Sequence, residues 1–170
     1  MSFYKKYRAK PEEEKCADPA KARARAVEIL CAREISSGQL YDRLCTGFTE
    51  QAAAFVVAEM VGLDYVNDDR YAEARAHGLL AARKSRRAAV QDLRQKGLSA
   101  QQIAQAVETV YAPDEEGESP ELEAAAALVR SRYRAKLASG RRDLVVAALM
   151  RRGFAYPIVK EAVRRVEEEL

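Results

Sequence analysis

Apolar residues recur at the spacing of an amphipathic helix along most of the chain, beginning near residue 20. Side chains three and four positions apart share one face of an α-helix, so this spacing predicts helices rather than strands. The first predicted helix has an apolar face made of Val27, Leu30, Cys31 and Ile35. Later segments with helical periodicity cover residues 67–83, 85–96, 121–137 and 141–152, and a last one starts near residue 156. The pattern therefore predicts an all-α protein.

One phrase of the sequence occurs three times, around Gly47, Gly97 and Gly153. A large apolar residue follows each glycine directly: Phe48, Leu98 and Phe154. The positions six, ten and thirteen residues after each glycine are small or apolar: Ala53, Val57, Met60, Ile103, Val107, Val110, Val159, Val163 and Val166. This recurrence indicates a tandem repeat with a period of about 50 residues. The first copy is degenerate, because Leu44 stands three residues before its glycine instead of four.

Each copy of the phrase lies in a segment long enough for three short helices. The predicted organisation is a flexible N-terminal tail (1–19), three-helix repeats at 20–65, 66–112 and 120–170, and an acidic linker at 113–119. A unit of about 50 residues is close to the lower limit for independent folding, so neighbouring repeats are expected to pack on one another. Tandem repeats of three-helix units, three in number, predict an elongated, curved array.

Several residues indicate where helices begin and end. Asn67 or Asp68 is expected to cap the helix that follows it, since a short polar side chain can accept a backbone N–H there. Gly97 suits the left-handed residue that ends a helix. Ser99 and Gln102 have the spacing of a capping box, which predicts another helix start.

The residue types needed for catalysis or metal binding are scarce. The cysteines are widely spaced, and His77 is the only histidine. The sequence NDDR at residues 67–70 offers paired carboxylates, for which helix capping is favoured over a metal or acid–base role. No P-loop or dinucleotide-binding glycine motif occurs. We therefore expect no enzyme activity, no metal and no cofactor.

The three cysteines, Cys16, Cys31 and Cys45, also bear on where the protein works. An odd number of widely spaced cysteines fits a reducing compartment better than a disulfide framework, so a cytoplasmic protein is expected. No apolar run is long enough for a membrane span or a signal peptide. A monomer is expected, because no excess apolar stripe is visible.

Charge is informative through its distribution rather than its sum. The formal net charge is only +3, but basic residues gather in the second and third repeats while acidic residues gather elsewhere. Such a positive surface can follow a phosphate backbone or meet an acidic protein surface. The candidate binding residues are Arg83, Lys84, Arg86, Arg87, Arg132, Arg134, Arg141 and Arg142. For Lys96, Arg151 and Arg152, which end predicted helices, the helix dipole is a sufficient explanation.

Two stretches carry a resemblance to a known family. The stretch "LDYVNDDRYAEARA", followed by basic residues and "VQDLRQKGLSAQQIAQAV", resembles the core signature of the RecX family of bacterial recombinase regulators. The matching positions are Val66, Asn67, Asp68, Tyr71, Ala72, Leu93, Lys96, Gly97 and Leu98. The third repeat echoes the second part at Leu149, Arg152, Gly153 and Phe154. The resemblance covers about residues 20–170.

The resemblance implies a function that periodicity alone does not. RecX-like proteins are built of three-helix repeats, bind the RecA recombinase in the groove of its nucleoprotein filament, and inhibit its ATPase and strand-exchange activities. They commonly bind DNA as well. The chain is thus expected to modulate recombination, DNA repair and the SOS response, with RecA and the backbone of single- or double-stranded DNA as partners.

Two other function classes remain open. A stand-alone helical DNA-binding module would need a recognition helix, but the helix after Gly97 presents Gln101, Gln102 and Gln105 and no arginine, which argues against it. A structural adaptor without a nucleic-acid role would bind a different partner. RecA regulation is the leading hypothesis.

Overall fold

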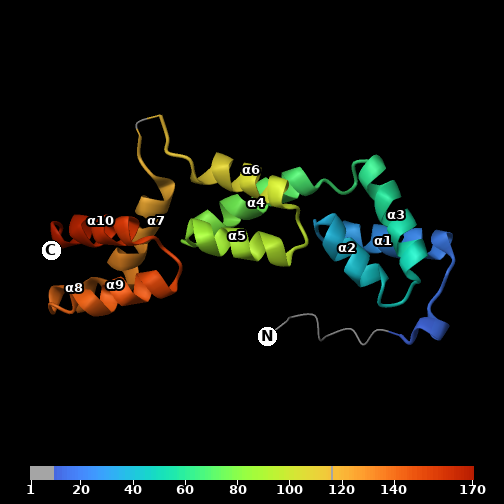
Figure 1. The fold of residues 1–170 in the computed structure, drawn as a ribbon, viewed down its shortest axis with the longest axis horizontal. Helices are drawn as coiled ribbons and strands as arrows, with labels where there is room; N and C mark the ends of the chain where they lie inside the picture. Colours follow the sequence, from blue (N-terminus) through green and yellow to red (C-terminus); the bar gives the residue numbers. More distant parts are fainter. Residues whose placement is uncertain (1–9, 116) are drawn as a thin grey trace. The chain divides into compact units, whose positions relative to one another are not determined.

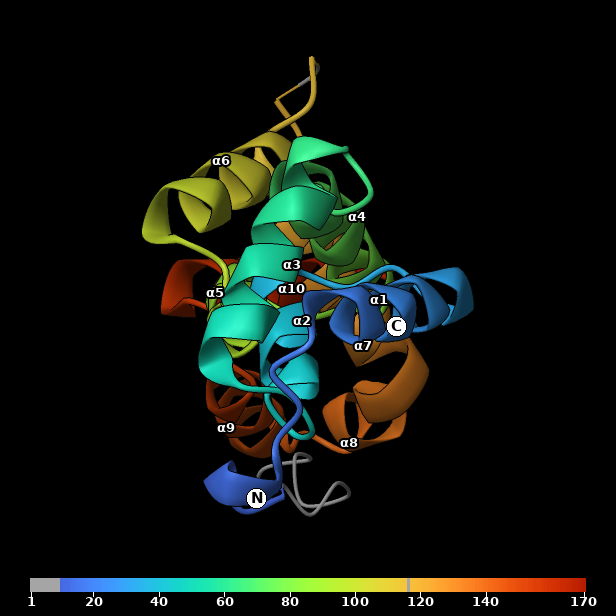
Figure 2. The same cartoon turned by 90° about the vertical axis from the view of Figure 1, so that its right-hand side faces the viewer.

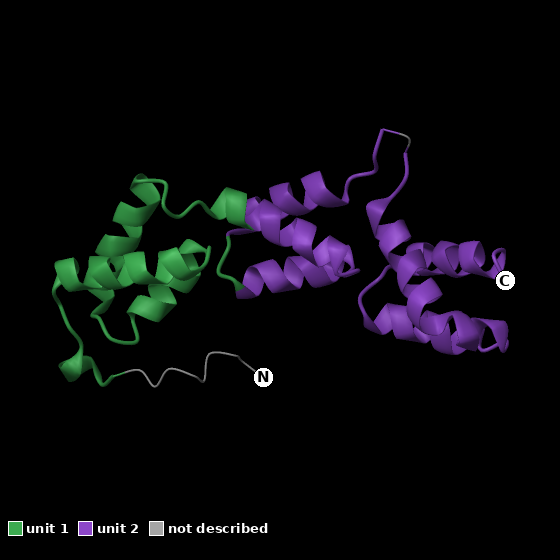
Figure 3. Ribbon diagram, turned by 180° about the vertical axis from the view of Figure 1, so that it is seen from behind, with its two compact units in different colours: residues 1–71, 96–98 green, residues 72–95, 99–170 purple. Residues whose placement is uncertain are grey.

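A computed structural model describes residues 10–115 and 117–170. Its regular elements are helices, and the described residues form no β-strand, only an isolated parallel bridge between Cys16 and Phe48. The prediction of an all-α protein is confirmed. The chain divides into two compact units, one of residues 1–71 with 96–98 and one of residues 72–95 with 99–170 (Figure 3).

The elements follow one another along the chain as short helices (Figure 1). In the order of the sequence they are η2 (Glu12–Glu14), α1 (Pro19–Ala32), α2 (Ser37–Leu44), α3 (Glu50–Gly62), α4 (Asp68–Ala81), α5 (Arg86–Gln95), α6 (Ala100–Tyr111), α7 (Pro120–Leu128), η3 (Val129–Tyr133), α8 (Arg134–Ala138), α9 (Arg142–Arg151) and α10 (Tyr156–Glu167). The long helix expected over 121–137 is continued through the π-helical segment η3. The boundaries proposed for the three repeats and the acidic linker stay a prediction.

In the first unit, α1 packs across α3 (Figure 2). The apolar face predicted for this helix is wrong. Val27 is 44% exposed, and Ile35 is buried but lies beyond the end of α1. The side chains that α1 buries are Ala22, Ala26 and Ile29. Two alanines let the backbones of α1 and α3 approach closely, so the small residues, rather than the larger Val27, face the core.

The positions counted from the repeated glycines do form the core. Of the residues six, ten and thirteen after each glycine, all are buried except Val57, which is partly buried. In the second unit, Phe154 and Leu149 pack with α10 residues Val159 and Val163 in one cluster with α7. The repeated phrase therefore reflects packing, because residues at the same spacing after each glycine face the interior of the protein.

The expected helix ends are present. The Asn67 Oδ1 atom accepts the backbone N–H of Arg70 at 2.9 Å, so Asn67 is the N-cap of α4. Ser99 and Gln102 form the predicted capping box of α6. Gly97 has a φ of 78°, in the left-handed region, but Gly47 does not have a positive φ. Helix α2 ends at Leu44, three residues before Gly47, whereas α5 and α9 end two residues before Gly97 and Gly153.

Residues 10–18 follow a defined path, although they were expected to belong to a flexible tail; residues 1–9 of that tail lie outside the described residues. The Lys10 backbone N–H donates to the Thr46 carbonyl at 3.0 Å, and the Cys16 N–H donates to the Gly47 carbonyl at 3.0 Å. In return, the Thr49 N–H donates to the Cys16 carbonyl at 3.1 Å. This segment therefore pairs with the loop between α2 and α3.

Candidate functional site

Ser36 and Ser85 are completely buried polar residues, and each precedes a helix. The Ser36 hydroxyl caps α2 by accepting the Gln39 N–H at 3.2 Å, and the Ser85 hydroxyl caps α5 by accepting the Ala88 N–H at 3.1 Å. Each hydroxyl also donates its own hydrogen to a distant carbonyl. A buried hydroxyl that both donates and accepts leaves no polar atom unsatisfied.

The carbonyls that receive these hydroxyls stand at the same point of the repeated phrase. Ser36 donates to the carbonyl of Lys96, directly before Gly97. Ser85 donates at 2.9 Å to the carbonyl of Arg152, directly before Gly153. We call the first arrangement, within the first unit, joint 1, and the second, within the second unit, joint 2. Joint 1 fastens the start of α2 to residues 96–98 of the same unit, and joint 2 fastens the start of α5 to the end of α9.

A carboxylate completes each joint. The Ser37 backbone N–H donates to Asp68 Oδ1 at 2.7 Å in joint 1, and the Arg86 N–H donates to Glu121 Oε1 at 2.9 Å in joint 2. A negative side chain is favourable at these helix N-termini because it meets unpaired N–H groups and the positive end of the helix dipole. Asp68 thus holds α2, while Asn67 caps α4.

The glycines allow each joint to close. A Cβ atom on Gly38 would lie 3.2 Å from the Gly97 Cα atom in joint 1. A Cβ atom on Gly153, whose φ is 90°, would lie 2.8 Å from the Ser85 Oγ atom in joint 2. A side chain at Gly153 would therefore both strain the backbone and displace the serine.

The eight candidate basic residues all belong to the second unit and are all exposed. In the group from the second predicted repeat, Arg86 forms an ion pair with Glu108. The Arg83 guanidinium donates to Ser131 Oγ at 2.6 Å and to the Ala127 carbonyl at 3.3 Å. Neither Lys84 nor Arg87 takes part in any of the ion pairs that form within residues 10–115 and 117–170.

The candidate basic residues of the third predicted repeat also include some with partners and some without an ion pair. Arg142 pairs with Glu167 at 2.9 Å, and Arg134 donates to the Glu169 carbonyl at 3.1 Å. Arg132 and Arg141 have no ion pair with any residue the structure describes. The ion pairs that do form are exposed, and such pairs are worth about 0–1 kcal/mol. A polyanionic partner could therefore compete for these arginines.

A surface pocket at joint 2 brings Arg87 together with Arg151 and Arg152, which lie far from it in the sequence. It has a volume of about 230 Å³, and its lining residues are Arg87, Ala88, Gln91, Met150, Arg151, Arg152 and Gly153. Arg87 was a candidate binding residue, whereas Arg151 and Arg152 were explained by the helix dipole. No regular pattern in the sequence links α5 to the end of α9, so only the fold reveals this grouping.

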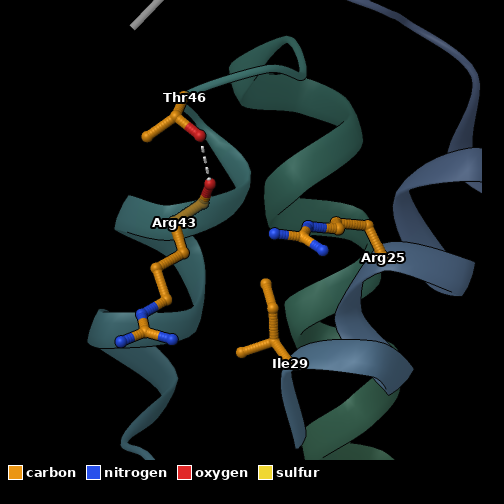
Figure 4. Close-up of a pocket in the computed structure, with 4 residues that line it drawn as sticks. All are labelled: Arg25, Ile29, Arg43 and Thr46. Atoms are coloured by element: carbon orange, nitrogen blue, oxygen red, sulfur yellow. Dashed lines mark hydrogen bonds between the residues drawn. The ribbon is translucent and has the colours of Figure 1, made fainter. Parts of the chain in front are cut away.

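A second pocket lies in the first unit, lined by Arg25, Ile29, Arg43 and Thr46 (Figure 4). The Thr46 hydroxyl donates to the Arg43 carbonyl at 2.7 Å, and the Arg43 side chain points along its own helix, away from Thr46 (Figure 4). Arg25 is paired with Glu28 at 2.7 Å. With a volume of about 40 Å³ and one arginine already paired, this pocket is a poorer anion site than the one at joint 2.

Tyr111 supports joint 2 from α6. Its side chain is 4% exposed, and its hydroxyl donates to the Lys84 carbonyl at 3.1 Å, one residue before Ser85. Burial, with the nearby charge of Glu121, raises the pKa of Tyr111 to about 12. The phenol is therefore neutral and acts as a donor at physiological pH.

Among the described residues, no group of three or more His, Cys, Asp or Glu side chains is placed to hold a metal ion. The helices of residues 10–115 and 117–170 include none both long and apolar enough to cross a bilayer.

Residues 67–107 match a family model described as the second three-helix domain of RecX. The chain is 30% identical over 98 residues to the regulatory protein RecX of Caldanaerobacter subterraneus subsp. tengcongensis, an alignment that covers 57% of this chain and 50% of that protein. It is 32% identical over 111 residues to the regulatory protein RecX of Myxococcus xanthus, covering 64% of this chain and 58% of that protein. The chain thus matches about half the length of these relatives.

Two solved structures share the fold. The crystal structure of RecX from Lactobacillus salivarius superposes with a TM-score of 0.72 at 18% identity, covering 88% of this chain and 96% of that one. A crystal structure of a regulatory protein RecX gives a TM-score of 0.72 at 22% identity, covering 84% and 71% of the two chains. At 18% and 22% identity, these two likenesses show that the chain shares the helical fold of the solved structures.

Proposed function

We propose that this protein binds the RecA recombinase in its nucleoprotein filament, inhibits the ATPase and strand-exchange activities, and so modulates recombination and DNA repair. The observation that carries the proposal is the match of residues 67–107 to the second three-helix domain of RecX. The proposed role is regulatory rather than catalytic, and the protein would act in the cytoplasm as a monomer.

The charges of the second unit support this proposal. All eight candidate basic residues are exposed there, and several have no acidic partner in the described part of the chain. A filament of RecA on DNA offers both acidic protein surface and phosphates, and either would pair with such side chains. Association would then weaken as salt is added.

The experiment that tests the proposal is the DNA-dependent ATPase of RecA, measured while this protein is titrated in below one copy per RecA. Inhibition at such ratios is expected, because a protein that acts on the filament affects many RecA subunits at once. Inhibition only when the protein coats the DNA would contradict the proposal and favour the stand-alone DNA-binding module.

Charge variants locate the surface. A triple variant with Lys84→Gln, Arg132→Gln and Arg141→Gln removes three of the candidate charges that have no ion pair with any described residue. A matched control with Lys21→Gln, Arg33→Gln and Lys160→Gln removes the same charge from exposed positions outside the candidate set. We expect the first variant to lose inhibition by about tenfold and the control to retain it. Circular dichroism of both variants shows whether the helices remain; equal inhibition by both would refute the site.

A further inference from the structure

We propose that the pocket at joint 2 binds a nucleic-acid strand through its phosphates, with Arg87, Arg151 and Arg152 as the phosphate ligands. The proposal deepens the proposed function and rests on it for the identity of the strand, the DNA of the RecA filament. It adds Arg151 and Arg152 to the binding surface, and it gives Arg87 a specific role.

Joint 2 fixes the positions of these arginines. The hydrogen bond between Ser85 and Arg152 holds the start of α5 against the end of α9. Arg87 lies two residues after Ser85, and its stem runs over Gly153: a Cβ atom on that glycine would lie 3.6 Å from Arg87 Cβ and 3.7 Å from Arg87 Cδ. Because the backbone beneath the pocket is held in this way, little conformational entropy would be lost there on binding.

The positive charge of the pocket is not neutralised by the described part of the protein. Arg87, Arg151 and Arg152 form none of the ion pairs found among residues 10–115 and 117–170. Other arginines of the same unit are paired; Arg130 binds Glu123 and Glu169, and Arg164 binds Glu161 and Glu168. Three like charges around one hollow repel one another, so an anion bound between them would be stabilised.

Joint 1 shows that closing a joint does not require these arginines. Gly38 stands two residues after Ser36, at the position that Arg87 has in joint 2. There the two backbones meet directly, since a Cβ atom on Gly38 would lie 3.2 Å from Gly97 Cα. Gln95 and Lys96 stand at the positions of Arg151 and Arg152. The same closure is thus reached with one basic residue instead of three, so the arginines of joint 2 are not needed for its closure and are available to a ligand.

The size and lining of the pocket favour a phosphodiester over a larger ligand. Its volume of about 230 Å³ is below the range of about 300–1,000 Å³ usual for small-molecule pockets. The volume suits a phosphate with part of its sugar, while the bases would remain outside. Met150, which is 43% exposed, offers an apolar contact to the sugar, and the Gln91 amide offers a polar one. Such contacts do not distinguish sequences.

The test is the binding of a fluorescein-labelled oligothymidylate, followed by fluorescence anisotropy in the absence of RecA. The variant carries Arg87→Gln, Arg151→Gln and Arg152→Gln, and the matched control carries Lys21→Gln, Arg33→Gln and Lys160→Gln. We expect the pocket variant to bind about tenfold more weakly than the control, and the slope of log Kd against log salt to fall by about 2, at roughly 0.7 per phosphate contact. Equal affinities and slopes for the two variants would overturn the proposal.

The RecA ATPase assay on the same variants separates this proposal from the proposed function. If the pocket variant loses inhibition of RecA but binds the oligonucleotide like the control, the pocket contacts protein and the phosphate assignment is wrong. If the unsubstituted protein fails to inhibit RecA but the pocket variant loses oligonucleotide binding, the proposed function is wrong while the pocket is a nucleic-acid site.

Discussion

The Ser85 hydroxyl donates to the Arg152 carbonyl at 2.9 Å while it accepts the Ala88 N–H at 3.1 Å. One buried side chain therefore caps α5 and fastens it to the end of α9, 67 residues further along the sequence. We expect the packing of the second unit around joint 2 to depend on this serine.

Substitution of Ser85 tests that dependence. Ser85→Ala removes the cap of α5 and leaves the part-buried hydrogen bond to the Arg152 carbonyl unmade, so we expect the free energy of unfolding to fall by about 1–3 kcal/mol. Urea unfolding followed by circular dichroism measures the change. Ser139→Ala, which removes an exposed hydroxyl bonded to the nearby Lys136 carbonyl, serves as the control and is expected to cost less than about 0.5 kcal/mol. Similar costs for the two variants would show that joint 2 contributes little stability.

Substitution by alanine is expected to have opposite effects on stability at Gly153 and at Gly78. Gly153→Ala forces a side chain into a left-handed backbone and against Ser85 Oγ, so a loss of about 2 kcal/mol or more is expected. Gly78 lies within α4 with open space around it, so Gly78→Ala is expected to stabilise the protein by about 0.5–1 kcal/mol. Thermal unfolding of both variants measures the two signs. A stable Gly153→Ala variant would contradict the close approach at joint 2.

Tyr111 gives joint 2 a dependence on alkaline pH. Its pKa is about 12 in the folded protein, above the value of about 10 for an exposed tyrosine. A raised pKa means that folding favours the neutral phenol. The stabilisation is therefore complete below pH of about 10 and is lost as the pH rises towards 12.

Ultraviolet titration of the tyrosines measures this effect. We expect one phenol to ionise near pH 12 and Tyr111→Phe to remove that step. The variant should also show a smaller loss of stability between pH 10 and 12 than the unsubstituted protein. A late step that persists in the variant would assign it to another tyrosine.

Much of the fold could be predicted from local signals. The capping box at Ser99, the cap at Asn67 and the left-handed Gly97 each depend on a few neighbouring residues, and the structure contains all three. The core positions followed from their spacing after each glycine. The face of α1 was mispredicted because Ala22 and Ala26 are weakly hydrophobic, so their burial depends on the close approach of α3 and not on the sequence of α1.

The candidate site was less accessible to sequence analysis. The basic residues could be found by their clustering, but their grouping in space could not, because Arg87 and Arg151 meet only through joint 2. One signal was available: Ser36 and Ser85 both stand directly before the second helix of a predicted repeat, and the third repeat has Arg141 there instead. A serine that recurs at a helix start predicts a cap, but the carbonyl that it also binds is visible only in the fold.

The bonds of Lys10 and Cys16 have a practical consequence for shortening the chain. A truncation that begins at Pro19 would retain every residue of α1 but would remove the donors that the Thr46 and Gly47 carbonyls use. Phe48, which is partly buried and pairs with Cys16, would become more exposed to solvent at the same time. Tolerance to truncation depends on such backbone bonds and burial rather than on helix boundaries. Deletion variants that preserve the first unit would therefore start before Lys10, and helix boundaries alone would misplace the cut.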